Sequence, residues 1–317
     1  MTTYLVRRTG QALVVVLGVM VVTFLLIHLE PGSAARATLG MKANSERIAV
    51  FDAANGLDRP LAAQFVTFVK QAGEGDFGTS YQLHQPVSTL IAQRLPRDAV
   101  LLGLSTLTAL AVALPMGIYQ AVRRDRVEDH AFTVIAFVLY SMPDFFFALL
   151  LIALFSVQLH LLPSQAPQAE SVAGILGDPR ALVLPVATLT LVSVAGFSRY
   201  MRSSAINTLA QDYVLVARAK GLPDRLVLSR HVLRNSLLPV ITVLGLMAPG
   251  IVTGAVIAES VFNYPGMGLL FFQAATSKDY PILLGSTLVV GVATVIGSLV
   301  ADIAYSLLDP RIRYDHA

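Results

Sequence analysis

The sequence has no cysteine and no tryptophan among its 317 residues. The lack of cysteine excludes disulfide bonds, thiolate metal sites and a cysteine nucleophile. Without tryptophan, any aromatic belt at a membrane surface has to come largely from the ten tyrosines. Charge is also scarce, because Asp, Glu, Lys and Arg make up only 14% of the chain, whereas an ordinary soluble domain carries about 25%.

Apolar residues, in contrast, make up 55% of the chain, and the mean hydropathy is +0.67. A single soluble core cannot hide that much apolar surface, so lipid is the expected solvent. The net charge is only +3, and nucleic acid is therefore not an expected partner. These features predict an all-α polytopic protein of the lipid bilayer.

Long apolar runs predict six transmembrane helices. The first run, Gly10–Leu29, is nearer 20 residues than the roughly 7 to 15 of a signal peptide, which favours a retained anchor. The remaining five runs lie at about 99–122, 131–159, 182–200, 237–258 and 282–307. The expected organisation is a first helix within 1–30, a subdomain over 31–98 and a five-helix core over 99–317.

The distribution of Lys and Arg predicts the orientation. Six membrane crossings place both termini on one side of the membrane. If that side is the cytoplasm, the two short loops on the opposite side carry only Arg180 and Lys278, as the positive-inside rule requires. We therefore expect a multi-pass protein of an inner (plasma) membrane with both termini cytoplasmic.

Two segments outside the apolar runs are long enough to fold. Residues 31–98 are expected outside the cell membrane, with a helix after Asn44, a turn at Asn55-Gly56 and a second helix from Arg59 to Gln71.

The second segment, residues 201–235, is expected in the cytoplasm as two short helices. The first should run from Gln211 to Lys220 and end at Gly221, since glycine accepts the left-handed conformation that follows many helices. Pro223 should open the second helix.

Motifs for enzymatic chemistry are missing from the sequence. It contains no GxxxxGK[ST] phosphate loop, no GxSxG elbow and no HExxH zinc pair, and its six histidines are scattered. We therefore expect no catalytic residue, no metal site and no cofactor in this chain. Any ATP-driven work has to come from a partner.

Asp144, which follows Pro143 in the middle of the third apolar run, is the informative charge within the predicted membrane region. A carboxylate at that depth is costly and should face water or a partner. It would either contact a substrate ammonium or a gating partner, or serve as a structural hydrogen-bond acceptor. An ion-coupled carrier would also use such an acid, but carriers usually have more spans and two repeated halves.

The cytoplasmic segment carries a motif. The sequences Asp212-Tyr213-Val214, Ala217-Arg218-Ala219-Lys220-Gly221-Leu222 and His231-Val232-Leu233-Arg234-Asn235-Ser236-Leu237-Leu238-Pro239 resemble the EAA loop of bacterial ABC importer permeases in its peptide-transporter form. In that family the loop is a coupling helix that seats in a groove of the ATPase subunit.

The resemblance implies a coupling role for Asp212, Tyr213, Ala217, Arg218, Ala219, Lys220, Gly221 and Leu222. Small alanines would permit close approach to the groove, and Gly221 would permit a sharp turn. The charges of Arg218 and Lys220 would anchor the rim of the contact.

Further matches to the dipeptide and oligopeptide B-type permeases run along the chain. They are Leu29-Glu30-Pro31-Gly32, Gly75-Asp76-Phe77-Gly78-Thr79-Ser80, Pro86-Val87, Arg94-Leu95-Pro96, Glu259-Ser260-Val261-Phe262, Pro265-Gly266-Met267-Gly268, Asp279-Tyr280-Pro281 and Leu308-Asp309-Pro310-Arg311. Two positions depart from the family pattern: Pro223 replaces a commoner Ser or Thr, and Asp144 replaces a commoner uncharged residue. The same subfamily includes nickel and oligosaccharide permeases.

The resemblance implies a permease subunit of an ATP-driven importer for di- or oligopeptides, or for nickel or another small solute. Its implied partners are a second permease, two ATPase subunits or one fused ATPase that bind ATP and Mg, and an extracytoplasmic peptide-binding protein. Polar residues expected to line the path are Ser141, Asp144, Thr190 and Ser193.

Overall fold

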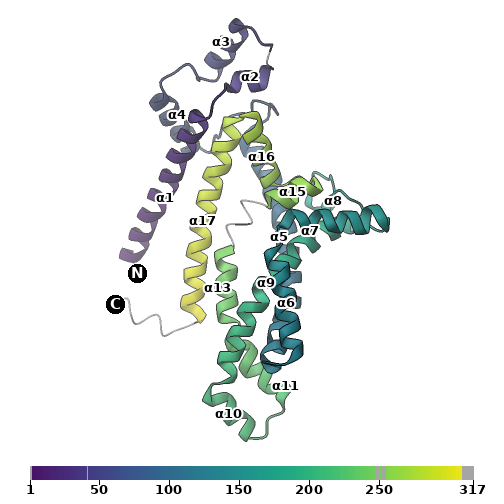
Figure 1. Cartoon of the computed structure of the whole chain (residues 1–317). Coiled ribbons are helices and arrows are strands. Elements are labelled where there is room, and N and C mark those ends of the chain that lie inside the picture. The colour runs from purple at the N-terminus through teal and green to yellow at the C-terminus, as the bar shows by residue number, and fades with distance from the viewer. Residues whose placement is uncertain (1, 41, 248–249, 251–254, 309–317) are drawn as a thin grey trace. The chain divides into compact units, whose positions relative to one another are not determined.

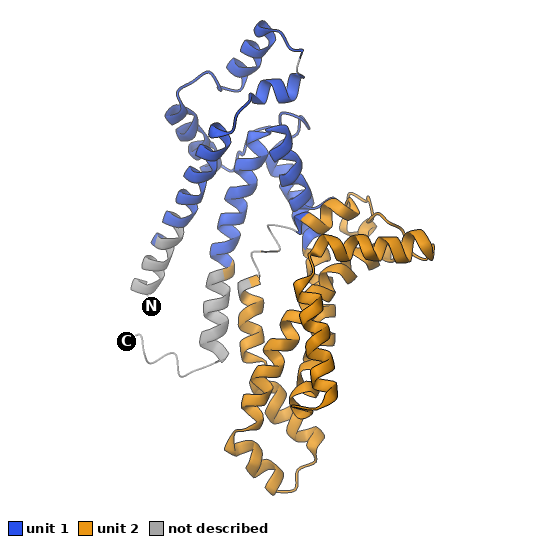
Figure 2. Cartoon of the chain, viewed as in Figure 1, with its two compact units in different colours: residues 1–98, 252–256, 265–296 blue, residues 99–251, 257–264, 297–317 orange. Residues whose placement is uncertain are grey.

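The computed structural model describes residues 2–40, 42–247, 250 and 255–308. Within these residues the regular structure is helical, apart from a single bridge pair between Thr79 and Pro86 (Figure 1). The predicted all-α class is confirmed. The chain divides into two compact units, and each has a hydrophobic core of its own (Figure 2).

Unit 1 comprises residues 1–98, 252–256 and 265–296. Its helices are α1 (Thr2–Leu29), α2 (Ala34–Leu39), α3 (Ser45–Ala54), α4 (Leu61–Gly73), the start of α5 (Val87–Val122), α16 (Met267–Ser277) and most of α17 (Tyr280–Leu308). Asn44 begins α3 as expected, since its Oδ1 accepts a hydrogen bond from the Arg47 amide at 2.9 Å. The core joins α1 to the starts of α5 and α17 through side chains such as Phe24, Val87 and Leu283.

Polar contacts, of which the Ser80–Asp279 bond is buried, fasten residues 31–98 to the turn between α16 and α17. The Ser80 hydroxyl donates to Asp279 Oδ2 at 2.6 Å, and the Gln82 amide donates to the same oxygen at 3.1 Å. Lys278 Nζ donates to the Pro31 carbonyl. Next to them, burial and then the charge of Asp279 raise the pKa of the Tyr81 phenol. These contacts connect parts of the chain that lie far apart in sequence.

Unit 2 comprises residues 99–251, 257–264 and 297–317. Its described elements are the rest of α5, α6 (Val127–Ser141), α7 (Asp144–Leu151), the π-helix η1 (Ile152–Gln158), α8 (Val172–Gly177), α9 (Pro179–Leu209), α10 (Asp212–Ala219), α11 (Asp224–Leu226), the π-helix η2 (Val227–Leu233), α12 (Arg234–Ser236), α13 (Leu238–Met247) and most of α15 (Val256–Phe262). α9 is the central helix, and α6, α7, α12 and α13 pack against it.

A glycine allows two long helices of unit 2 to cross closely. A Cβ atom added at Gly117 of α5 would lie 2.9 Å from both the Arg202 amide nitrogen and the Ser198 carbonyl oxygen of α9. Both are backbone atoms, so no side-chain rotation could relieve the clash. The small residue thus brings the two helix backbones together.

Within the described residues, three helices are long and apolar enough to cross a membrane: 87–122, 179–209 and 280–297. The helix α6 and the α7–η1 segment pass the same test only as a pair, with a bend of 100° between them. The run predicted as a span at about 131–159 is therefore a broken helix, and that it crosses the membrane once stays a prediction. Met142 takes an extended conformation, and Pro143 has no N–H to continue the helical hydrogen bonds of α6.

The other predicted spans are met in part. The first run lies in the 28-residue helix α1, of which Val14–Leu29 is classed as a shorter apolar helix. The fifth run, 237–258, begins in α13 but continues through residues 248–249 and 251–254, which lie outside the described part of the chain. Six membrane crossings therefore remain a prediction, whereas a multi-pass helical architecture is observed.

Candidate functional site

The helix α10 carries the motif residues of the 211–235 segment, and its inner face is buried. Val214 and Ala217, three residues apart on one helical face, pack with Ala121, Ala205, Val227 and Val232. Sequence analysis placed Ala217 at a partner contact, but only 5% of its surface is exposed. That expectation is corrected: Ala217 packs inside its own chain. Of the two alanines of the motif, Ala219 is the exposed one.

The outer face of α10 exposes apolar side chains. Leu215 is 55% exposed and Val216 51% exposed. We define the α10 outer face as Asp212, Tyr213, Leu215, Val216, Arg218, Ala219 and Lys220, all of which are exposed. Sequence analysis missed Leu215 and Val216. Once Val214 and Ala217 are assigned to the core, helical spacing places both residues on the outside.

A left-handed glycine ends α10. Gly221 has φ +76°, its amide donates to the Arg218 carbonyl at 2.9 Å, and the Leu222 amide donates to the Ala217 carbonyl at 3.3 Å. This pair of bonds is the Schellman arrangement, which satisfies carbonyls left over at a helix end. The predicted end of the helix at Gly221 is confirmed. Leu222 turns back and packs against the core side chains of α10.

Polar contacts fix the second half of the segment against α10. The Asn235 side-chain amide donates to the Tyr213 hydroxyl at 2.9 Å and to the His231 carbonyl, also at 2.9 Å. Arg218 Nε lies 3.5 Å from Asp224 Oδ1, on the far side of the turn. The Tyr213 ring is therefore held in place although 42% of the residue is exposed.

The same segment is anchored to α9. The hydroxyl of Ser236, which is fully buried, donates to Thr208 Oγ1 at 3.0 Å. Thr208 in turn donates to the Ser204 carbonyl at 2.9 Å, one turn earlier in α9. The 211–235 segment is thus continuous in packing with the end of a membrane-length helix.

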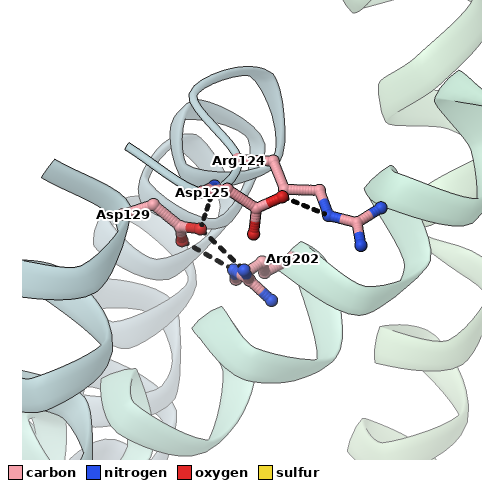
Figure 3. Close-up of polar contacts among 4 residues, drawn as sticks. All are labelled: Arg124, Asp125, Asp129 and Arg202. Atoms are coloured by element: carbon pink, nitrogen blue, oxygen red, sulfur yellow. Dashed lines mark hydrogen bonds and ion pairs between the residues drawn. The ribbon is translucent and has the colours of Figure 1, made fainter. Parts of the chain in front are cut away.

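A partly buried ion pair joins α9 to the start of α6 (Figure 3). Arg202 donates from Nε to Asp129 Oδ1 and from Nη2 to Asp129 Oδ2, both at 2.7 Å. The Asp125 amide, in a left-handed turn, also donates to Asp129 Oδ2 at 3.1 Å. A two-point contact between planar groups fixes orientation as well as distance. Sequence analysis did not identify this pair, because nothing in the spacing of two residues so far apart indicates that they meet.

The four expected path residues differ in their surroundings. Ser141 is exposed at the end of α6, and Asp144 is half-buried at the start of α7, so both lie at the helix break. Ser193 of α9 is half-buried. Thr190 is buried, and its hydroxyl donates to the Ser105 carbonyl of α5 at 3.2 Å. The expectation for Thr190 is therefore corrected to a contact between helices.

Metal binding has no structural support in the described part of the chain. No group of three or more His, Cys, Asp or Glu side chains in those residues could hold a metal ion. The chemistry available on the α10 outer face and at the helix break is recognition by apolar, cationic and hydroxyl groups.

Two family models match the chain. The model described as binding-protein-dependent transport system inner membrane component matches residues 113–314. The model of the N-terminal membrane component of the same systems matches residues 1–102.

Curated relatives match over their full length. The oligopeptide transport system permease protein AppB of Bacillus subtilis is 36% identical over 99% of this chain and 100% of its own. A putative peptide permease protein of Brucella ovis is 38% identical, with 99% of both chains covered. The glutathione transport system permease protein GsiC of Salmonella choleraesuis is 34% identical over 99% of this chain and 100% of its own.

Proposed function

Because the chain belongs to the family of binding-protein-dependent transport system inner membrane components, we propose that it is a translocation-path subunit of an ATP-driven importer of short peptides. Relatives named for oligopeptide, peptide and glutathione transport support a peptide substrate. Nickel or another small solute is the alternative within the same type of complex. A second permease of similar fold completes the path, and a binding protein outside the membrane delivers the solute.

The α10 outer face is the proposed contact with the ATPase subunit, which binds ATP and Mg. The observation that carries this proposal is the pair Leu215 and Val216, both more than half exposed on a helix whose inner face is buried. Apolar side chains exposed on a water-facing segment favour a protein partner. Tyr213, Arg218 and Lys220 add an aromatic anchor and positive charge around them.

Movement of α10 would be transmitted to the membrane-length helix α9, and from there to α6, through contacts within unit 2. Val214 and Ala217 pack directly on Ala205 of α9, and Ser236 binds Thr208 of the same helix. Arg202 of α9 then holds Asp129 at the start of α6. The ATPase would thus pull on two helices through one rigid segment. Residues 31–98 are the proposed contact with the binding protein, and both termini are cytoplasmic in this arrangement.

The test is copurification of the tagged chain with its partners from native membranes in mild detergent. Replacing both Leu215 and Val216 with Glu should remove the ATPase and retain the second permease, because charge prevents burial of the α10 outer face. Val50→Glu is the matched control, since Val50 is 65% exposed in the segment of residues 31–98. It should retain the ATPase.

Recovery of the ATPase with the doubly substituted chain would contradict the assigned coupling face. If the unmodified chain copurifies with no ATPase at all and peptide does not stimulate ATP hydrolysis, an ion-coupled carrier becomes the better hypothesis. Asp144 would then be the first residue to titrate.

A further inference from the structure

An arginine stacked on a tyrosine ring lies beside the break between α6 and α7. The guanidinium of Arg199 in α9 lies over the ring of Tyr140 in α6, with its central carbon 5.4 Å from the ring centroid. Both residues are exposed. Within the part of the chain that the structure describes, no Asp or Glu lies within ion-pair distance of Arg199. Among the described residues of unit 2, the Tyr140 ring is the partner that the structure shows for this charge.

The guanidinium points away from the predicted cytoplasmic end. α6 and α9 lie side by side (Figure 1). The Asp129–Arg202 pair joins them at that end (Figure 3). At about 1.5 Å per residue, Tyr140 lies about 16 Å along α6 from Asp129, whereas Arg199 lies only about 4.5 Å along α9 from Arg202. The Arg199 side chain bridges much of the difference, since helical side chains lean toward their own N-terminus.

An arginine in this position is costly if it faces lipid. Arg199 directly follows the apolar stretch 181–198 of a membrane-length helix. Its side chain does not run toward the nearer interface, which is the usual way for arginine to lower that cost. The exposed surface around Arg199 and Tyr140 is therefore better suited to a water-filled path than to hydrocarbon.

The helix break supplies a second, independent indication of water. α6 ends at Ser141, immediately after Tyr140, and Pro143 offers no N–H to its last carbonyls. Irregular backbone at membrane depth is tolerated only where it is buried in protein or lines a water-filled cavity. Ser141 and Tyr140 are both exposed at this point. The guanidinium, the ring and the free carbonyl ends thus lie in one polar region.

We propose that Arg199, positioned by the face of Tyr140, binds the C-terminal carboxylate of the peptide as it passes through the subunit. This rests on the proposed function and names the group of the substrate that the path recognises. A ring face holds the cation and leaves the N–H edge of the guanidinium free. That edge matches a carboxylate with two parallel hydrogen bonds. Because the site is wet, the contact is weak enough to release the peptide.

The experiment compares uptake of trialanine with uptake of its C-terminal amide in the reconstituted complex. The binding protein is the same for every variant, so a change in the acid-to-amide uptake ratio reports on the permease. Arg199→Gln should lower this ratio about fivefold by slowing uptake of the acid alone, since charge-assisted hydrogen bonds are the stronger ones. Arg199→Lys should lower the acid-to-amide uptake ratio less than Arg199→Gln does. Lysine keeps the positive charge but cannot donate two parallel hydrogen bonds as the guanidinium does.

Variants of the aromatic residue test the positioning role. Tyr140→Phe should keep the ratio and Tyr140→Leu should lower it, since only the ring face attracts the cation. Arg180→Gln is the matched control: Arg180 lies at the opposite end of α9 and donates to the Leu161 carbonyl at 3.0 Å. It should leave the ratio unchanged.

Three results would overturn the inference. An unchanged ratio in Arg199→Gln would exclude a carboxylate contact. Equal loss of acid and amide uptake, in a variant that remains monodisperse, would assign Arg199 to a lipid phosphate or to a carboxylate of a partner chain. Failure of the unmodified complex to take up either peptide would instead refute the proposed substrate class, and the inference with it.

Discussion

The two segments outside the membrane-length helices are held in different ways. In unit 1, residues 31–98 are fastened by contacts between residues far apart in the chain: Ser80 with Asp279, 199 residues away, and Pro31 with Lys278, 247 residues away. In unit 2, the 211–235 segment is held by nearby residues, with Asn235 bound to Tyr213 and Ser236 to Thr208, 22 and 28 residues apart.

We call residues 31–98 the platform and the 211–235 segment the lever, because the two kinds of attachment permit different movements. A segment tied at several distant points cannot move without the helices that hold those points. A segment built from local contacts can move as one piece, and its apolar outer face remains free for a partner. Both units nevertheless depend on tight glycine contacts and on a buried carboxylate, so matched substitutions can test how far the comparison holds.

The largest effect is expected where α5 crosses α9. Gly117→Ala should lower the stability of unit 2 by about 2–3 kcal/mol, because the new Cβ meets backbone atoms of α9 that cannot rotate away. Gly285→Ala in unit 1 should cost less, about 1 kcal/mol, because its Cβ meets Val87 and Phe77 side-chain atoms at 2.8 and 3.0 Å. The measurement is the fraction of monodisperse protein after heating in detergent.

Gly103→Ala in α5 is the control for this pair. Nothing lies within 4 Å of the Cβ position at Gly103, so this substitution should not lower the melting temperature. Equal losses at Gly117 and Gly285 would mean that the α5–α9 crossing relaxes more easily than its backbone contacts imply.

Two of the buried carboxylates, Asp129 in unit 2 and Asp279 in unit 1, should respond differently to loss of charge. Asp129→Asn should cost about 1–3 kcal/mol, because Arg202 then loses its anionic partner. Asp279→Asn should cost less than about 1 kcal/mol, since the remaining amide oxygen can still accept from Ser80 and Gln82. The same heating assay compares the two variants.

A double substitution checks the origin of the first effect. Asp129→Asn combined with Arg202→Gln should recover part of the loss, because no charge is then left without its partner. A larger loss for Asp279→Asn than for Asp129→Asn would show that the platform, rather than the helix bundle, depends on its buried charge.

A smaller change in stability than at Gly117 is expected at the end of α10. Gly221→Val should cost about 1–2 kcal/mol, because a β-branched residue is strained at φ +76°. Gly221→Asn is the control, since asparagine tolerates this conformation and nothing lies within 4 Å of the Cβ position. If α10 is the lever, the valine variant should hydrolyse ATP with several-fold less uptake per ATP. Unchanged uptake per ATP in a folded complex would count against this role.

Sequence predicted those elements that local chemistry determines. Asn44 begins α3 and Gly221 ends α10 as expected, since a helix cap depends on neighbouring backbone groups. The start of α5 was missed. It begins at Val87, before the apolar run expected at 99–122, because its first turns carry Arg94, Pro96 and Arg97 and resemble a polar loop. Only tertiary packing of Val87, Leu90 and Ile91 in the unit 1 core explains those turns.

Other features depend on where distant residues meet. Pro143 in an apolar run is compatible with either a kink or a complete break, and the bend of 100° was not predictable from it. The Asp129–Arg202 and Ser80–Asp279 contacts join residues that no local pattern connects. For the candidate site, the sequence located α10 correctly but not its buried face, which only the packing of Val214 and Ala217 reveals.

The break at Pro143 also makes α6 shorter than the hydrocarbon layer of a membrane is thick. α6 has only 15 residues, a length of about 22 Å, whereas the hydrocarbon layer is about 30 Å thick. Such hydrophobic mismatch is met by thinning the bilayer or by admitting water at the helix end. A solute passing beside α6 would then cross a septum thinner than the surrounding membrane, and the transmembrane voltage would fall over that shorter distance.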